Sequence, residues 1–203
     1  MIVSLPYGKS FVELNLPDEN ILAVLKSKEF SQIPDEVNAI KNLLKAPIES
    51  ESLCSLASKS SKICIVVSDY TRAAPNKVLI PPIIEELKKA GRKADELKIL
   101  VAYGLHKPIS RNDLKDFLGE EIVESFSVVN HDAEDENSLV YLGKTSFETP
   151  VYLNKLVAEY DLTVLTGLIE PHFFAGYSGG RKSILPGVAG RESIFHNHSF
   201  KMI

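Results

Sequence analysis

Ionisable side chains follow several apolar segments of this chain. Asp69 and Arg72 come after ICIVV, His106 comes after ILVAYG, and Glu170 and His172 come after TVLTGLI. Two histidines at one cleft suit general acid and base catalysis, because imidazole changes its charge closest to neutral pH. His106 and His172 are therefore candidate acid/base groups if the fold brings them together.

The segment from Gly167 to Gly190 reads GLIEPHFFAGYSGGRKSILPGVAG and combines six glycines with a carboxylate, a histidine and an Arg-Lys pair. This mixture predicts a backbone wrapped closely around a ligand. Lys182 suits phosphate binding or covalent attachment. A Walker phosphate loop is excluded, because Arg181 stands where that motif has glycine and Pro186 falls where its helix would run. The loop amides, with the charge of Arg181, could still cradle a phosphate.

Some strand-end residues have simpler interpretations that stay open. Asp69 could cap the turn that follows it, and Arg72 could form an ion pair with Asp69. His131 and Asp132 follow SVVN and could form a turn with a solvated histidine.

The two last histidines alternate in IFHNH. On a helix that begins near Gly190, His196 and His198 would point in quite different directions, so they could not easily bind one ion. A single histidine with a non-protein ligand is feasible, whereas the local ligand pairs of a zinc site are absent from the sequence.

The composition is that of an ordinary globular protein. The 203 residues are 44% hydrophobic and 25% charged, with a formal net charge of −4, which favours neither disorder nor a nucleic-acid surface. The sequence shows no signal peptide and no run long enough to span a membrane, so we expect a cytoplasmic location without membrane or nucleic-acid partners. Cys64 lies in an apolar run and, like Cys54, is predicted to be a free thiol.

Continuous apolar runs alternate with amphipathic helical segments along most of the chain. The predicted buried strands cover residues 62–69, 97–104, 127–130 and 161–169, and the predicted helices cover 34–47, 81–91, 109–126 and 155–160. A two-stranded stretch is expected at 139–154, and a small hairpin joined at Tyr7–Lys9 is expected at the N-terminus. Parallel strands need crossover connections, so this alternation predicts an α/β fold with a mostly parallel sheet and helices on both faces.

These elements predict a single domain over residues 1–203, with the hairpin and helices in 1–60 and the α/β core in 61–203. In open parallel sheets, ligands bind outside the carboxyl ends of the strands. We therefore expect Asp69, Arg72, His106, His172 and Lys182 to line one cavity at that edge.

Four stretches together are similar to the N-terminal part of the nickel-pincer lactate racemase family. They are SDYTRAAPNK, AYGLHKPIS, VNHD and GLIEPHFFAGYSGGRKSILPGVAGRESIFHNH, in this order between Ser68 and His198. Family members are roughly twice as long as this chain. The resemblance thus implies that the family's C-terminal domain, a partner in forming the cleft, is absent from this chain, and that these 203 residues alone are inactive.

The resemblance implies an enzyme that racemises a 2-hydroxy acid such as lactate with a nickel-pincer nucleotide, a pyridinium dithiocarboxylic acid mononucleotide that holds nickel. By matching position, His106 and His172 resemble the paired acid/base residues, Lys182 the lysine joined to the cofactor, and His198 the protein ligand of nickel. Arg72, with Asp69 beside it, resembles the part that steadies substrate and cofactor.

The resemblance and the glycine loop together define a predicted cofactor-binding set: Lys182, Asp69, Gly179, Gly180, Arg181 and Ser183. Lys182 must be neutral to react, and we expect the charge of the neighbouring Arg181 to lower its pKa. Nickel accepts imidazole and sulfur in a square plane, so His198 with the pincer would supply four donors.

Two other functions fit the residues. One is a nucleotide or phosphate binding module without catalysis, in which the glycine loop binds an anion and the histidines are incidental. The other is a metal-dependent hydrolase, which would need a zinc-binding cluster around Glu170 and His172.

Overall fold

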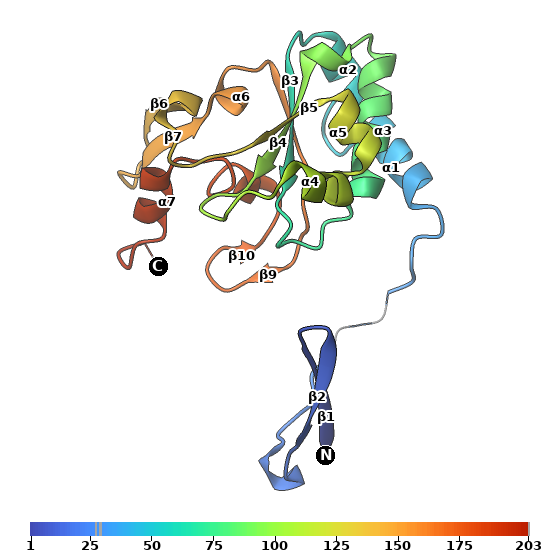
Figure 1. The fold of residues 1–203 in the computed structure, drawn as a ribbon, viewed down its shortest axis with the longest axis vertical. Coiled ribbons are helices and arrows are strands. Elements are labelled where there is room, and N and C mark those ends of the chain that lie inside the picture. Colours follow the sequence, from blue (N-terminus) through green and yellow to red (C-terminus); the bar gives the residue numbers. More distant parts are fainter. Residues whose placement is uncertain (27, 29, 203) are drawn as a thin grey trace. The chain divides into compact units, whose positions relative to one another are not determined.

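The computed structural model describes residues 1–26, 28 and 30–202 (Figure 1). Contacts within the chain divide it into two compact units, Met1–Pro34 and Asp35–Ile203. Among the described residues, no helix is both long and apolar enough to cross a membrane.

The first unit is a β-hairpin with a short extension. Strand β1 (Ile2–Tyr7) pairs antiparallel with β2 (Ser10–Asn15), and Gly8 takes a φ of +61° in the turn between them, as the predicted hairpin requires. A short 3-10 helix, η1 (Asp18–Asn20), follows. No side chain of β1 or β2 is fully buried, so this hairpin has no core of its own.

The second unit contains a four-stranded parallel sheet, which confirms the predicted α/β class. Its strands lie in the order β5-β4-β3-β8, and they are β3 (Ile63–Ser68), β4 (Leu97–Ala102), β5 (Ser127–Asn130) and β8 (Leu162–Leu165). Every neighbouring pair is parallel. The carboxyl ends of the four strands therefore share one edge.

Helices cover both faces of this sheet, but unequally (Figure 1). The larger layer consists of α1 (Glu36–Lys45), α2 (Leu53–Ser58), α3 (Asn76–Lys89), α4 (Arg111–Leu118) and α5 (Glu120–Ser125). Ile63, Ile65 and Val67 of β3 point into the core beneath this layer. Cys64 and Val66 point to the other face, where the short α6 (Lys155–Ala158) and Val188 cover them.

The remaining elements extend from the second face. Strands β6 (Leu139–Lys144) and β7 (Pro150–Asn154) form the predicted antiparallel pair, and α7 (Arg191–Asn197) packs beside β7. The glycine-rich segment contains β9 (Pro171–His172), β10 (Gly176–Tyr177) and the 3-10 helix η4 (Gly180–Ser183). The other two 3-10 helices are η2 (Ala94–Glu96) and η3 (Glu136–Ser138).

Local features of two predicted helices differ from expectation. The helix expected over 109–126 is two helices, because Gly119 takes a φ of +100° and ends α4 before α5 begins. Pro34 lies before α1 rather than in its first turn, since Asp35 is the N-cap and accepts the N–H of Asn38. A capping box of Ser110 and Asp113 begins α4.

The helices α1 and α2 belong to the second unit. Leu53 and Ala57 of α2 are buried in the same cluster as β3, and Leu44 of α1 packs against it. The contact boundary therefore lies at Pro34, whereas the sequence placed the start of the α/β core at residue 61. That residues 1–203 act as one cofactor-binding domain stays a prediction. Cys54 and Cys64 are free thiols, and burial raises the pKa of Cys64 to about 12.

Candidate active site

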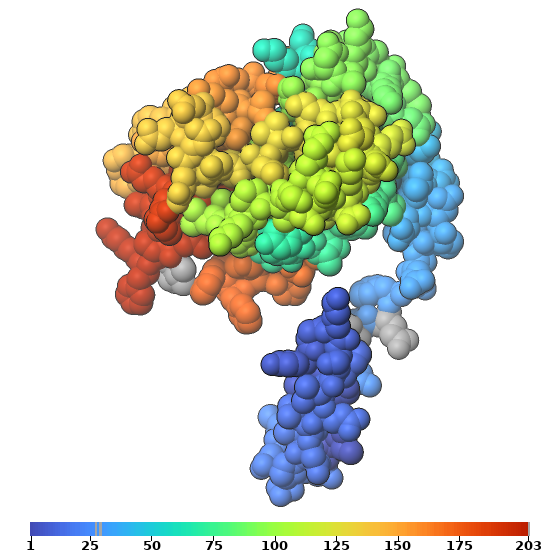
Figure 2. All heavy atoms as spheres, in the orientation of Figure 1, coloured from blue at the N-terminus to red at the C-terminus, as the bar shows by residue number. Residues whose placement is uncertain are grey.

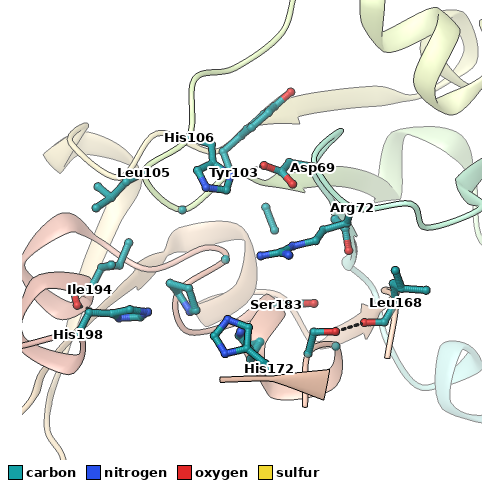
Figure 3. Close-up of a pocket in the computed structure, with 18 residues that line it drawn as sticks. Asp69, Arg72, Tyr103, Leu105, His106, Leu168, His172, Ser183, Ile194 and His198 are labelled. Atoms are coloured by element: carbon teal, nitrogen blue, oxygen red, sulfur yellow. Dashed lines mark hydrogen bonds and ion pairs between the residues drawn. The ribbon is translucent and has the colours of Figure 1, made fainter. Parts of the chain in front are cut away.

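A cavity of about 270 Å³ lies at the carboxyl ends of β3 and β4 (Figure 3). Of the residues singled out from the sequence, the structure brings these into its lining: Asp69, Arg72, His106, His172, Gly179, Lys182, Ser183 and His198. Asp69, Arg72, His106, His172 and Lys182, which were expected to line one cavity, all do so. Gly180 and Arg181 are not among the lining residues.

Asp69 and His106 form the tightest polar contact of the cavity. Oδ2 of Asp69 lies 2.5 Å from Nδ1 of His106, and the Asp69 side chain is only 3% exposed. The other carboxylate oxygen accepts the hydroxyl of Thr71 at 2.7 Å. A carboxylate only accepts hydrogen bonds, so Nδ1 of His106 carries a proton, and in the neutral ring the lone pair is on Nε2.

The ion pair between Arg72 and Asp69, left open as one interpretation of the sequence, does not form. Arg72 instead lies 3.4 Å from Glu170, which follows β8, and both side chains are partly exposed. This pair joins the loop after β3 to the glycine-rich segment. An ion pair this exposed adds little stability, so its main effect is to place the guanidinium at the cavity.

Hydrogen bonds of a small side chain and close backbone packing hold the glycine-rich segment together. The hydroxyl of Ser178 accepts the N–H of Glu170 and donates to the carbonyl of Leu168. A Cβ at Gly179 would lie 3.0 Å from that Leu168 oxygen, and one at Gly187 would lie 2.4 Å from the carbonyl oxygen of Ser183. Close packing inside the segment therefore requires glycine at these two positions. The sequence interpretation had attributed the glycines to close contact with a ligand.

Ser183 and Lys182 stand in the short helix η4, beneath the cavity. The hydroxyl of Ser183 is buried and donates to the carbonyl of Thr166 at the end of β8, at 3.3 Å. This bond fixes the helix to the sheet, so that the neighbouring Lys182 lines the cavity.

The pKa of Lys182 is lowered. Burial of the amine is the largest cause and the positive charge of Arg72 is the next, while Glu170 acts in the opposite direction. The predicted effect of Arg181 is wrong, because Arg181 is exposed and its charge is not among the causes. A lowered pKa leaves more of the amine neutral and able to act as a nucleophile.

His172 ends β9 and faces the cavity from the opposite side to His106 (Figure 3). Its Nδ1 accepts the backbone N–H groups of Phe174 and Ala175, each at 3.3 Å. The pKa of His172 is lowered, first by desolvation and then by the charges of Lys182, Arg72 and His198, with Glu170 acting against them.

His198 and His196 point to different places, as predicted. His198 lines the cavity, and its Nδ1 lies 3.1 Å from the carbonyl oxygen of Ile194, which leaves Nε2 without a hydrogen-bond partner among the described residues. His196 contacts the hydroxyl of Thr149 at 3.0 Å. The structure thus offers one histidine from this region to the cavity.

His131 is neither solvated nor at the cavity, so that interpretation is wrong. Its side chain is buried, its Nε2 lies 3.0 Å from the carbonyl oxygen of Ala189, and its Nδ1 lies 3.2 Å from the amide of Asn154. Burial lowers its pKa. His131 therefore ties the end of β5 to β7 and to the segment before α7.

Tyr103 is a cavity residue that sequence reasoning missed. It follows β4 directly, is buried, and its hydroxyl accepts the N–H of Ile109 at 3.2 Å. This bond closes the turn that carries His106. The available signal was its position directly after an apolar strand, which also singled out Asp69 after β3.

A parallel α/β unit with polar side chains gathered at the carboxyl ends of its strands is the arrangement of a small-molecule-binding domain. A family model described as the lactate racemase N-terminal domain matches residues 7–203. The chain therefore belongs to the lactate racemase N-terminal domain family, which confirms the resemblance seen in the sequence.

Two lactate racemases are similar over nearly the whole chain. The protein from Thermoanaerobacterium thermosaccharolyticum is 38% identical over 203 residues, which are 99% of this chain and 47% of that protein. The protein from Lactiplantibacillus plantarum is 36% identical over 203 residues, 99% of this chain and 48% of its own length. This chain thus spans about half the length of these relatives.

A solved structure shares the fold. The lactate racemase apoprotein from Thermoanaerobacterium thermosaccharolyticum superimposes with a TM-score of 0.87 at 39% identity, over 98% of this chain and 46% of that chain.

Proposed function

We propose that this chain is the cofactor-binding part of an enzyme that racemises a 2-hydroxy acid such as lactate. The observation that carries the proposal is the cavity in which His106, His172 and a lysine of lowered pKa meet. A racemase treats two mirror-image substrates, and a histidine on each side of one cavity suits that task. The named relatives, both lactate racemases, support the same activity.

The residues at the cavity fit a nickel-pincer nucleotide. Lys182 would carry the covalent attachment, because a half-buried amine of lowered pKa is a better nucleophile than an ordinary surface lysine. His198 would contribute its free Nε2 to nickel. Among residues 1–26, 28 and 30–202, no group of three His, Cys, Asp or Glu side chains could hold a metal ion, so a metal here would take its other donors from the nucleotide.

When bound, the nucleotide would supply an acceptor for the hydride on the substrate's Cα. The chain's own residues manage the proton and the charge. His106 accepts the hydroxyl proton at Nε2, and buried Asp69 stabilises the resulting imidazolium through Nδ1. Arg72 places a guanidinium at the cavity, where it would bind the substrate carboxylate.

The covalent attachment is tested by intact-mass measurement and peptide mapping of protein from cells that make the cofactor. We expect a mass increase that maps to Lys182 and is lost in Lys182→Ala. Lys107→Ala is the matched control, because Lys107 is an exposed lysine on the neighbouring loop. A chain that binds the nucleotide without any mass increase would support the binding-module alternative instead. The hydrolase alternative would need a metal cluster around Glu170 and His172, and no such group exists among the described residues.

A further inference from the structure

The ring of His172 lies at the base of a very tight hairpin. Strand β9 ends at His172 and β10 begins at Gly176, so only Phe173, Phe174 and Ala175 form the tip. This hairpin projects at the surface of the second unit (Figure 2), where the Phe173 and Phe174 side chains are exposed. The tip folds back on the ring through two backbone hydrogen bonds.

These two hydrogen bonds decide which nitrogen of His172 carries the proton. A backbone N–H can only donate, so Nδ1, which receives both N–H groups at 3.3 Å, must be the acceptor. A neutral imidazole has one ring proton, which therefore sits on Nε2. A second proton on Nδ1 would confront both amide hydrogens.

His106 is held in the opposite state. Its Nδ1 is 2.5 Å from Oδ2 of Asp69, a carboxylate that can only accept. The proton of neutral His106 therefore sits on Nδ1, and Nε2 has the lone pair.

We propose that the chain sets its two candidate acid/base histidines in opposite tautomers, with Asp69 fixing His106 as a proton acceptor at Nε2 and the Phe174 and Ala175 amides fixing His172 as a donor at Nε2. The inference rests on the proposed function for its meaning in catalysis. Phe174 and Ala175 are thus positioning residues, which act through their backbone rather than their side chains.

The arrangement gives the two histidines different first steps. The Nε2 lone pair of His106 forms a bond to the substrate's hydroxyl proton as the O–H bond breaks, and the ring becomes an imidazolium paired with Asp69. His172 donates a hydrogen bond from Nε2 and keeps its proton. For His172 to remove a proton from the substrate at Nε2, its own Nε2 proton must first leave. Nδ1 must then take up a proton, which requires breaking its two hydrogen bonds to the backbone N–H groups of Phe174 and Ala175. The hairpin tip therefore has to move before the roles can exchange.

Long-range ¹H–¹⁵N NMR of the ¹⁵N-labelled chain tests this directly. The spectrum is recorded at about pH 8, above the ordinary histidine pKa of about 6.5, so that neutral rings dominate. His106→Gln and His172→Gln assign the signals. We expect His172 to show a protonated Nε2 and a bare Nδ1, and His106 to show the reverse.

The same spectrum contains its own references. His131 is bonded as an Nε2–H tautomer between Ala189 and Asn154, and His198 as an Nδ1–H tautomer through Ile194. Ala175→Pro removes one of the two N–H donors and should mix the tautomers of His172, whereas Ala175→Ser keeps the N–H and should leave them unchanged. If the proline variant does not fold, the wild-type spectrum alone decides.

A proton on Nδ1 of His172, two equally populated tautomers there, or the same tautomer in both histidines would overturn the inference. The measurement uses neither cofactor nor turnover. A failure here leaves the attachment at Lys182 untouched, and a missing attachment leaves the tautomers untouched, so the two proposals can fail separately.

Discussion

Two parts of the molecule build the cavity in different ways. The edge of the sheet supplies Asp69 and His106 from the ends of neighbouring parallel strands, and they are joined side chain to side chain. The glycine-rich segment supplies His172 and Lys182, and it is shaped by hydrogen bonds between its own backbone and small side chains such as Ser178. Substitutions at the sheet edge should therefore act on one contact at a time, whereas the segment should respond as a unit.

The largest effect is expected at Lys182. If the proposed function holds, then in a full-length version with the length of the relatives Lys182→Ala should abolish racemase activity, because no other side chain replaces a covalent attachment. Arg181 cannot substitute for it, since a guanidinium is not deprotonated at ordinary pH. Racemisation assays with both lactate enantiomers check the prediction, and a variant that keeps both cofactor and turnover would contradict the attachment.

Removal of either histidine should cost less. His106→Ala and His172→Ala should each lower kcat by roughly two to four orders of magnitude, the usual contribution of a general acid or base. Nickel content, measured by metal analysis, should be unchanged in both, because His198 and Lys182 are intact. Equal losses for the two enantiomers in both variants would mean that the sheet edge and the segment contribute alike.

Much of the sheet edge was predictable from sequence. Apolar runs identified β3 and β4, and a parallel sheet necessarily brings the residues after them, Asp69 and His106, to one edge. The bonding inside the glycine-rich segment was not predictable in the same way. Nothing in its composition shows that Gly187 packs on Ser183, or that the amide of Ala175 turns back to His172, because such contacts depend on a backbone path without regular periodicity.

Charge and burial were also misjudged where sequence neighbours and spatial neighbours differ. Arg72 could have paired with Asp69, three residues away, but it contacts Glu170, far along the chain. His131 follows a strand like the cavity residues do, yet it is turned inward to Ala189 and Asn154. The position of a residue after a strand predicts that it lies at the carboxyl edge of the sheet. It does not predict whether the side chain points into the cavity or into the protein interior.

The sheet-edge contact can be weakened without changing its shape. Asp69→Asn replaces a charged acceptor with a neutral one, and a hydrogen bond to a charged group contributes about 1.5–3 kcal/mol. Activity in the full-length protein should therefore fall roughly 10- to 150-fold. Steady-state kinetics should show the loss mainly in kcat, because His106 would be a poorer base while the substrate contacts remain. An unchanged kcat would show that Asp69 only holds the turn with Thr71.

His131 should matter for stability rather than for chemistry. His131→Ala would leave the carbonyl of Ala189 and the amide of Asn154 without partners, at a cost of about 1–3 kcal/mol in the free energy of unfolding. Denaturant unfolding measures this change, and His196→Ala, which loses one contact to Thr149, should cost less. A His131 variant of normal stability but without activity would return His131 to the site.

The difference in unfolding free energy between wild type and His131→Ala should change with pH in one direction. Burial lowers the folded-state pKa of His131, so its stabilising contribution is fully present above the unfolded-state pKa of about 6.5 and is lost as the pH falls towards the folded pKa. The stability gap between wild type and His131→Ala should therefore narrow as the pH falls below about 6.5. A gap that widens on acidification would show that the folded protein binds a proton at His131 more readily than the unfolded chain.

The smallest effect links the two parts of the cavity. Arg72, from the sheet edge, lowers the pKa of Lys182 in the segment, and Glu170 raises it. Arg72→Gln should therefore raise that pKa and slow the acylation of Lys182 by a small anhydride at neutral pH, whereas Glu170→Gln should lower the pKa and speed the reaction. Arg181→Gln is the matched control, because it removes the same charge from the sequence neighbour that lies outside the cavity lining, and it should leave the rate unchanged. Site-resolved mass spectrometry over a pH series gives all three rates. A larger change in the acylation rate for Arg181→Gln than for Arg72→Gln would contradict the prediction. It would mean that the sequence neighbour, rather than Arg72 across the cavity, sets the pKa of Lys182.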